Sequence, residues 1–379
     1  MLLPILTNAD DLRGKRVLLR LDLNLPVKDG AVTDAYRALR VSRTLQFLRE
    51  SGACTLIISH IESKETTSLR PVFDALARQM PIAFAATIEE AREKLRTAPN
   101  GSFLLLENLR IWKGEKENSS AFAGELAALA DIYVNEAFSA SHRAHASIVG
   151  VPDMLPHYAG FLFEEEVTRL SKALSPPHPA LVILGGAKFE TKLPLIERFR
   201  GIADIIYVCG ALANDIYRAR GYETGVSLIS DSTISSTLLQ NPNIQVPSDV
   251  IVRTPSGNSE KGADALLKGE KIVDAGGDAI ADLRALIEKA KFVLWNGPLG
   301  EYEAGFDAGT VAAAQLLAES DAETIVGGGD SLAVVGKLGL LERFSFVSTG
   351  GGAMLEFLAT GTLPGIEALL HNKLLHNKR

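Results

Sequence analysis

The sequence has few cysteines and lacks any long apolar run. Only two cysteines occur among 379 residues, Cys54 and Cys209, each within or at the end of a short apolar segment. A free thiol in such a place usually acts as a small buried hydrophobe, so we expect no structural disulfide. No apolar run approaches the ~18 residues that a spanning helix needs, and no basic segment with a cleavage site opens the chain. We therefore expect a cytoplasmic protein without a membrane partner.

An excess of positive charge is also absent. The chain has 39 lysines and arginines against 46 aspartates and glutamates, which gives a formal net charge of -7. Such a chain presents no overall basic field to a polyanion, so we expect no nucleic-acid partner. Hydrophobic residues make up 46% and charged residues 22%, an ordinary globular composition. At roughly 100 to 200 residues per domain, this length favours two domains.

Several common catalytic signatures are missing. The chain contains no GxxxxGK[ST] phosphate loop, no HExxH and no paired CxxC, and its TGGGAMLEF segment lacks the third glycine of a GxGxxG fingerprint. A nicotinamide-dependent dehydrogenase would suit the fold expected below but lacks this fingerprint. The metal role most compatible with the chain is Mg²⁺ held by a carboxylate and nucleotide phosphates, and Asp330 is the candidate carboxylate.

Short apolar runs alternate with longer amphipathic stretches along the whole chain. This alternation predicts an α/β fold with parallel sheets. The predicted strands lie within 16–24, 54–60, 103–108, 131–138, 180–186, 204–210, 250–255, 291–297, 324–329 and 344–349. Three prolines in SKALSPPHPA, residues 171–180, cannot continue a helix and mark a boundary. We predict one domain at 1–170, with the tail 366–379 packed on it, and a second at 171–365.

The residues that follow the predicted strands differ between the two halves. Ligands of open α/β sheets sit at the carboxyl ends of the strands, so these residues are the first candidates for a site. In the first half they are polar or basic side chains suited to a small anion: Asp22, Asn24, His60, Asn108, Arg110, Asn135, His142 and Arg143. In the second half most are glycine turns, which offer backbone N–H groups to phosphate where they enter helices. Taken singly, each glycine pair also fits an ordinary tight turn, and each arginine a solvated surface charge.

Seven segments in order resemble one known family. They are RLDLNLPV, LLLENLRIWKGEKEN, NEAFSASHRAHASIVG, ILGGAKFETK, WNGPLGEYE, IVGGGDS and STGGGAMLEFL, and together they resemble the phosphoglycerate kinases over nearly the whole chain. The resemblance implies two Rossmann-like domains joined by an interdomain helix and hinge. It also implies a monomer that transfers a phosphoryl group reversibly between ATP and 3-phosphoglycerate, with Mg²⁺, giving ADP and 1,3-bisphosphoglycerate.

The motif match also implies roles for individual residues. The catalytic pair would be Arg37 and Lys192. The substrate-binding residues would be Asp22, Asn24, Arg37, His60, Arg110, His142 and Arg143. The nucleotide-binding residues would be Gly185, Gly186, Lys188, Lys192, Gly210, Asn296, Glu303, Gly328, Gly329, Asp330 and Ser331, with Asp330 on Mg²⁺. The transferring phosphoryl would also meet backbone N–H groups at Gly350, Gly351 and Gly352.

Several segments depart from the family pattern, and the departure that bears on the substrate site is at residues 59–64. Where the family reads SHLGRP the chain reads SHIESK, so Glu62 stands at a glycine position, Ser63 at that of a substrate-binding arginine, and Lys64 at the proline. A carboxylate beside an anion site is unfavourable unless Lys64 pairs with it. This departure leaves open a second interpretation, a non-catalytic nucleotide-binding or scaffold relative. The presence of Arg37, Lys192 and Asp330 favours the enzyme.

Overall fold

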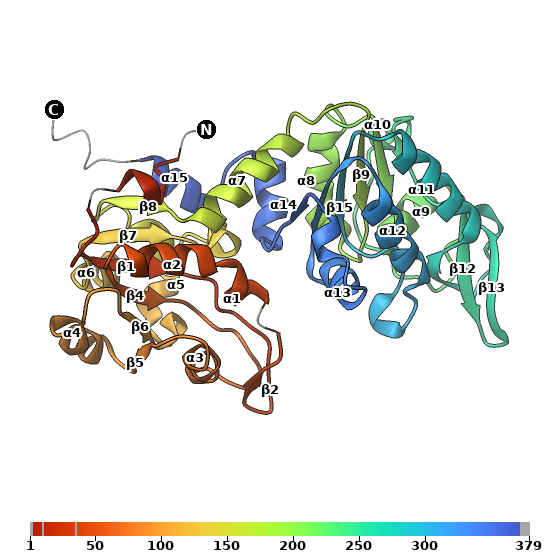
Figure 1. The fold of residues 1–379 in the computed structure, drawn as a ribbon. Helices are drawn as coiled ribbons and strands as arrows, with labels where there is room; N and C mark the ends of the chain where they lie inside the picture. The colour runs from red at the N-terminus through yellow and green to blue at the C-terminus, as the bar shows by residue number, and fades with distance from the viewer. Residues whose placement is uncertain (1–2, 10, 35, 372–379) are drawn as a thin grey trace. The chain divides into compact units, whose positions relative to one another are not determined.

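The chain folds into two compact units. The computed structural model describes residues 3–9, 11–34 and 36–371, shown in Figure 1. One unit comprises Met1–Thr168 together with Thr362–Arg379, and the other comprises Arg169–Gly361. The boundary between Thr168 and Arg169 falls inside helix α7 (Phe161–Ala173). We call them the first and the second unit.

The first unit contains a six-stranded parallel sheet in the order β5-β6-β4-β1-β7-β8. Its strands are β1 (Arg16–Arg20), β4 (Cys54–Ile58), β5 (Ala83–Ala85), β6 (Phe103–Leu106), β7 (Ile132–Asn135) and β8 (His157–Ala159). Every residue of β4, β6 and β7 is buried, as expected when helices cover both faces of a parallel sheet. A short hairpin, β2 (Val27–Lys28) with β3 (Ala31–Val32), lies outside this sheet.

The helices of the first unit alternate with its strands along the chain. The α-helices are α1 (Tyr36–Arg40), α2 (Ser42–Glu50), α3 (Arg70–Ala77), α4 (Ile88–Arg96), α5 (Lys113–Lys116), α6 (Ser120–Ala127), the first part of α7, and α15 (Pro364–Leu370). Short 3-10 or π turns are η1 (Leu6–Asn8), η2 (Leu109–Ile111), η3 (Phe138–Ala140) and η4 (Ala146–Gly150). Helix α15 packs on β8 and η4: the backbone carbonyl of Leu369 lies 3.2 Å from His157 Nε2, and the Gly365 N–H donates to the Ser141 carbonyl at 2.9 Å. Of the expected tail 366–379, residues 372–379 lie outside the described residues.

The second unit repeats this architecture and adds a second sheet. Its parallel sheet has the order β11-β10-β9-β15-β16-β17, and the added antiparallel sheet has the order β13-β12-β14. The parallel strands are β9 (Ala180–Leu184), β10 (Ile205–Val208), β11 (Ile244–Gln245), β15 (Phe292–Asn296), β16 (Glu323–Gly327) and β17 (Phe346–Val347). The antiparallel strands are β12 (Asp249–Thr254), β13 (Gly257–Gly262) and β14 (Lys271–Ala275).

Seven α-helices, in addition to the end of α7, belong to the described part of the second unit. They are α8 (Phe189–Phe199), α9 (Ala211–Ala219), α10 (Ser236–Leu239), α11 (Gly277–Lys289), α12 (Ala308–Glu319), α13 (Gly329–Lys337) and α14 (Gly352–Thr360). The 3-10 turns are η5 (Ala263–Ala265), η6 (Tyr302–Ala304) and η7 (Leu341–Arg343). Helix α14 packs beside α8 (Figure 1).

The predicted α/β class with parallel sheets is confirmed, with one correction. The sequence pattern predicts a strand of a parallel sheet at 250–255, but this run, up to Thr254, lies in β12 of the antiparallel sheet. Only Pro255 and Ser256 separate β12 from β13, and a connection of two residues can join only antiparallel strands. Over the residues that the structure describes, no single helix is long and apolar enough to cross a membrane; two consecutive helices, Gly352–Thr360 and Pro364–Leu370, reach that length and composition only when taken together.

A buried carboxylate fixes the start of α7 in the first unit. Glu136, which follows β7, accepts hydrogen bonds from the N–H groups of Leu162 at 3.1 Å and Phe163 at 3.0 Å, and from the Thr44 hydroxyl. Burial raises the pKa of this carboxyl to about 6, although these hydrogen bonds oppose the change. The close packing leaves no room for a side chain at Gly160, where a Cβ atom would lie 2.1 Å from Glu136 Oε2.

We predict that Gly160→Ala destabilises the first unit by roughly 1 to 3 kcal/mol, because the added methyl group overpacks a buried site. The matched control is Gly124→Ala, inside α6, where a Cβ atom would meet nothing within 4 Å. This change should be neutral or stabilise the unit by up to about 1 kcal/mol, since alanine is the better helix former. Denaturant unfolding followed by circular dichroism measures both changes. Equal midpoints for the two variants would contradict the prediction.

Candidate functional site

The first unit gathers polar side chains at the carboxyl ends of four neighbouring strands. The strands β6, β4, β1 and β7 are consecutive in the sheet, so the residues that follow them share one edge. Asp22 and Asn24 follow β1, His60 follows β4, Arg110 lies in η2 after β6, and His142 and Arg143 follow β7. The topology therefore places these six predicted substrate-binding residues along one edge of the sheet.

Arg37 is held against the loop that follows β1. Its Nη1 donates to Asp22 Oδ2 at 3.0 Å and to the backbone carbonyl of Asn24 at 3.4 Å. Ser139 also donates to the Asp22 carboxylate. The Arg37 side chain is 39% exposed, so this guanidinium has an anchored orientation and remains open to a ligand.

Three cations surround a single carboxylate at this edge. Glu62 forms an ion pair with Arg110, and its oxygens lie 3.5 Å from Lys116 Nζ and 3.6 Å from Arg143 Nη1. We call Arg110, Lys116 and Arg143 the cation cluster. Within the described ranges, the ion-pair partners of Glu62 are these three, and Lys64 is not among them. The sequence suggests that Lys64 pairs with the Glu62 carboxylate, but the cations that neutralise it come from η2, α5 and the loop after β7.

Two imidazoles near the cluster, His60 and His145, are neutral at pH 7. His60 is buried, and its Nδ1 lies 3.0 Å from Arg20 Nη2. Burial first, and then the charges of Arg20, Arg110 and Arg143, lower the pKa of His60 far below its usual range. The same causes lower the pKa of His145 to about 4. A neutral His60 serves this region as a hydrogen-bonding group and adds no positive charge.

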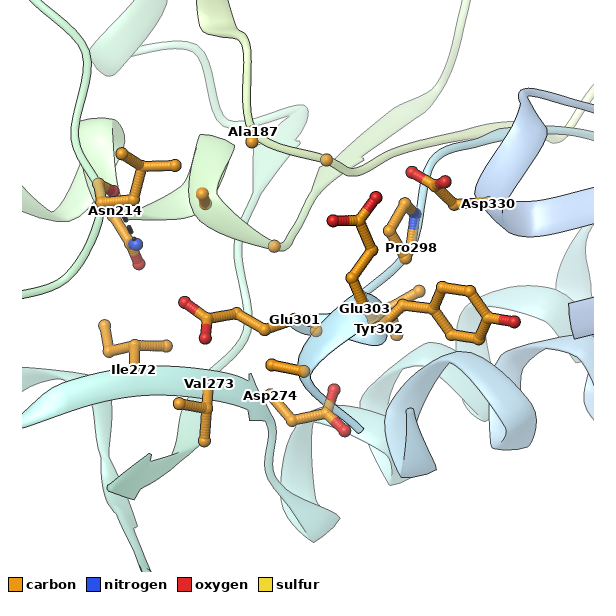
Figure 2. Close-up of a pocket in the computed structure, with 17 residues that line it drawn as sticks. Ala187, Asn214, Ile272, Val273, Asp274, Pro298, Glu301, Tyr302, Glu303 and Asp330 are labelled. Atoms are coloured by element: carbon orange, nitrogen blue, oxygen red, sulfur yellow. Dashed lines mark hydrogen bonds between the residues drawn. The ribbon is translucent and has the colours of Figure 1, made fainter. Parts of the chain in front are cut away.

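The second unit contains a cavity of about 340 Å³ at the corresponding edge of its sheet. Its walls come from the turns after β9, β10 and β15, from β14, and from η6 (Figure 2). The predicted residues Gly186, Gly210, Glu303 and Asp330 line it. Figure 2 shows the Glu303 carboxylate pointing toward the Ala187 loop, whereas the Tyr302 ring points away from it.

Two glycine turns come into backbone contact beside this cavity. A Cβ atom at Gly185 would lie 2.1 Å from the Pro298 carbonyl oxygen, and one at Gly297 would lie 2.2 Å from the Gly185 carbonyl oxygen. The Gly185 N–H donates to the Asn296 carbonyl at 2.9 Å, which joins the two turns directly. Only glycine permits the two backbones to come this close. The glycines therefore determine the shape of the cavity wall in addition to allowing the chain to turn.

Three helices of the second unit begin directly after glycines that have a positive φ angle. Gly210, Gly328 and Gly351 are the N-caps of α9, α13 and α14, with φ angles of 60°, 98° and 53°, and no side chain caps these helices. The helix dipole favours negative charge at these helix starts. Two of the first N–H groups already have partners: Leu212 in α9 donates to the Gly186 carbonyl at 3.2 Å, and Ala353 in α14 donates to the Gly350 carbonyl at 3.0 Å. Lys188 is the N-cap of α8, while Gly329 and Gly352 are the first residues of α13 and α14.

A buried lysine connects α8 with β15. Lys192 is buried, and its Nζ donates to Asn296 Oδ1. Burial lowers the pKa of this ammonium to about 8, although Cys209 and Asp330 oppose the change. Ser331 Oγ accepts from the Gly297 N–H at 2.9 Å, and a Cβ atom at Gly328 would lie 3.2 Å from Asn296 Nδ2. The predicted residues Lys192, Asn296 and Ser331 thus meet around the ends of β15 and β16.

The structure adds residues that the sequence did not single out. In the first unit these are Lys116 and His145. In the second unit the cavity is also lined by Asn214, Leu228, Ile272, Asp274 and Glu301, among others. Lys116 and Glu301 lie inside segments already matched to the family, KGEKEN and GPLGEYE, so the matched segments themselves were the available signal. Asp274 is the fourth residue of the run KIVDA, which forms β14 and is not among the predicted strands. Burial raises the pKa of its carboxyl to about 6.

Comparisons with known proteins identify the family of this chain. The family model described as phosphoglycerate kinase matches residues 6–361. The chain belongs to the phosphoglycerate kinase family. It is 39% identical over 390 residues to the phosphoglycerate kinase of Methylorubrum populi, covering 96% of this chain and 98% of that protein. It is 41% identical over 381 residues to that of Thermus thermophilus, with 95% and 98% covered.

A solved structure agrees with the fold as well. The structure of phosphoglycerate kinase from Coxiella burnetii matches with a TM-score of 0.84 and 36% identity, covering 97% of this chain and 98% of that one. Members of the phosphoglycerate kinase family are phosphotransferases with a carboxyl group as acceptor, so the family fixes the class of reaction.

The residues at the cavity fit the Mg²⁺–nucleotide complex that the family implies. Over the described ranges, no group of three or more His, Cys, Asp or Glu side chains could hold a metal by itself. Mg²⁺ commonly takes one or two carboxylates and completes its octahedron with waters and substrate phosphates. Asp330, at the cavity and in the first turn of α13, is suited to supply that carboxylate.

We predict that ADP affinity weakens as the pH rises through about 8, because the free protein then loses the Lys192 ammonium. The pKa is lowered, so the charged form prevails below it and disappears above it. The loss should reach roughly tenfold between about pH 7.5 and 9.5, the scale of one charge-assisted contact. Calorimetric titration at fixed ionic strength measures it. In Lys192→Arg the guanidinium stays charged throughout, so the ADP affinity of this variant should not change with pH over this range. The same pH dependence in the wild type and the variant would show that Lys192 is not its cause.

Proposed function

We propose that this chain is an active phosphoglycerate kinase in which the first unit binds 3-phosphoglycerate and the second binds ADP or ATP with Mg²⁺. The observation that carries the proposal is the chemical difference between the two sheet edges. One edge presents arginine and lysine side chains, and the other presents a cavity with uncapped helix N-termini and a buried lysine. A small, highly charged acid suits the first edge, and a nucleotide suits the second.

The reaction needs no nucleophile and base pair. The phosphoryl group moves from the β-phosphate oxygen of ATP to a carboxylate oxygen. The attacking oxygen is already ionised, so no proton has to be removed. Catalysis is then positioning together with neutralisation of the moving group. Arginine and lysine side chains are the groups suited to this work, and we assign Arg37 and Lys192 to the transferring phosphoryl.

The glycerate would be held by the residues at the edge of the first sheet. Arg110 and Arg143 supply charge to its carboxylate or phosphate oxygens, and Asp22 and Asn24 orient Arg37. His60 and His142 would contribute hydrogen bonds; His142 Nε2 already accepts from Arg143 Nε at 3.2 Å. These roles follow the family motifs residue by residue.

The nucleotide would occupy the cavity of the second unit. Glu303 suits the ribose hydroxyls because a carboxylate accepts their hydrogen bonds. The glycines at 185, 186, 210, 328 and 329 let the backbone approach the nucleotide, and Lys188, Asn296 and Ser331 lie around its phosphates. Mg²⁺, bound through Asp330, would neutralise phosphate charge, and the N–H groups at Gly350, Gly351 and Gly352 would stabilise the charge developing in transfer.

The experiment that tests the function is a coupled assay with ATP, Mg²⁺ and 3-phosphoglycerate. Turnover is expected; its absence, with nucleotide binding retained, would favour the non-catalytic relative that the SHIESK segment leaves open.

We predict that Arg37→Ala lowers turnover by hundreds-fold, about 3 to 4 kcal/mol, because the side chain would act on charge that develops in the transition state. The matched control is Arg40→Ala in the same helix, whose guanidinium pairs with Glu165 at 3.0 Å and is assigned no contact with the substrate. The control should stay within about twofold of the wild-type turnover. An Arg37→Ala variant that keeps more than about a third of wild-type turnover would remove Arg37 from the mechanism.

We predict that Asp330→Asn raises the Mg²⁺ concentration needed for half-maximal activity by roughly tenfold or more, because the metal loses its charged protein ligand. Binding of 3-phosphoglycerate, measured by calorimetry without nucleotide, should not change. Equal losses in both measurements would show that Asp330 is structural.

A further inference from the structure

The Glu62 carboxylate occupies a position that suits a ligand anion. It belongs to the loop after β4 and reaches three cations: Arg110 by an ion pair, Lys116 Nζ at 3.5 Å and Arg143 Nη1 at 3.6 Å. Partial burial raises the pKa of this carboxyl, but the charges of Arg110, Arg143 and Lys116 outweigh that effect and hold it below its usual value. The carboxylate is therefore charged at pH 7 and partly neutralises the cation cluster.

Arg110 has donors that Glu62 does not use. The Arg110 side chain is only 7% exposed, and the ion pair engages Nη1. Of the atoms that the structure describes, none accepts a hydrogen bond from Arg110 Nε or Nη2, although both are buried. A buried guanidinium N–H without a partner is costly, and the planar fork of arginine matches an anion with two or more oxygens. Glu62 fills this site only in part.

The Glu62 side chain can leave the cluster without moving its loop. It is 45% exposed, so water can receive the released carboxylate. Its backbone N–H donates separately to Asn24 Oδ1 at 2.9 Å, which anchors the loop independently of the side chain. With Glu62 in place the cations and the carboxylate together present a formal charge of +2, whereas the cluster alone presents +3, so displacement would expose one more positive charge to a ligand and would free Arg110 Nη1.

We propose that Glu62 is an internal competitor of the substrate: its carboxylate holds Arg110 in the free protein and is expelled when a phosphorylated carboxylic acid binds. The inference rests on the proposed function, since it takes the cation cluster as part of the 3-phosphoglycerate site. Glu62 thereby sets the substrate affinity of this chain. Each binding event must break the ion pair before Arg110 meets the ligand.

The test is the isosteric change Glu62→Gln, with Glu117→Gln as the matched control. Glu117 lies directly after α5 and pairs with Lys113 at 3.3 Å, so its change removes the same charge from the same unit without touching the cluster contacts described above. The intact protein is titrated calorimetrically with 3-phosphoglycerate and with inorganic phosphate at one ionic strength, because salt screens such contacts. In Glu62→Gln both dissociation constants should fall by about 5- to 30-fold. A fully buried ion pair would give a larger effect, but the Glu62 side chain is nearly half exposed and solvent weakens its ion pairs. The control should change neither constant by more than about twofold.

A second pair of variants tests whether the effect passes through Arg110. In an Arg110→Ala background, Glu62→Gln should tighten phosphate by less than about twofold, because the ion pair with Arg110 no longer exists and only the longer contacts with Lys116 and Arg143 remain. A thermal melt of each variant establishes that it is folded. An undiminished gain in this background would show a general charge effect and overturn the competitor role.

The outcomes separate this inference from the proposed function. If phosphate tightens in Glu62→Gln but 3-phosphoglycerate binds no better than phosphate, the competitor stands and the assigned substrate fails. If 3-phosphoglycerate binds well to the wild type and Glu62→Gln leaves its affinity unchanged, the assigned substrate stands and the competitor fails. Failure of Glu62→Gln to bind either probe also overturns the inference, because a cluster freed of its carboxylate must attract anions.

Discussion

Each unit holds a cationic side chain almost entirely out of water at the carboxyl edge of a parallel sheet. Arg110 in the first unit is 7% exposed and Lys192 in the second 8%. Desolvating a charge is costly unless an anion or strong hydrogen bonds compensate, so both sites are incomplete without negatively charged partners. Burial lowers the pKa of both side chains, but arginine remains charged while Lys192 approaches neutrality near pH 8. The free protein thus stores binding free energy at the two positions where phosphorylated ligands are expected.

The sequence predicted best what depends on strand ends. Gly186, Gly210, Glu303 and Asp330 line the cavity because glycine turns and acidic residues after apolar runs follow the topology of a parallel sheet. The sequence was a poorer guide to cavity residues that come from outside the parallel sheet. Asp274 lines the same cavity from β14, a strand of the antiparallel sheet, which the parallel-sheet interpretation did not include. β12 and β13 are antiparallel because a turn of two residues joins them. The length of this connection, and not the apolar run, determines the direction of pairing.

Glu62 shows why neighbours in sequence are poor guides to ion pairs. The sequence offered Lys64 as the compensating charge because it lies two residues away, yet the carboxylate meets Arg110 and Arg143, 48 and 81 positions further along the chain. Parallel topology explains the difference: the loops after β4, β6 and β7 leave the same edge of the sheet, so residues far apart in sequence converge there. Family membership fixed the reaction class without revealing this contact, since the family pattern has glycine at this position.

The same carboxylate has opposite effects on folding and on binding. In the free protein Glu62 offsets the mutual repulsion of Arg110, Lys116 and Arg143, and its lowered pKa means that the folded state favours the charged form. A carboxyl group with a lowered pKa stabilises the fold above its unfolded-state pKa, and that contribution is lost as the pH falls through the folded-state value. Removing the charge should therefore cost some stability while it strengthens anion binding. A glycine at this position would leave the three cations without this carboxylate, whereas here Glu62 neutralises part of their charge before any anion arrives.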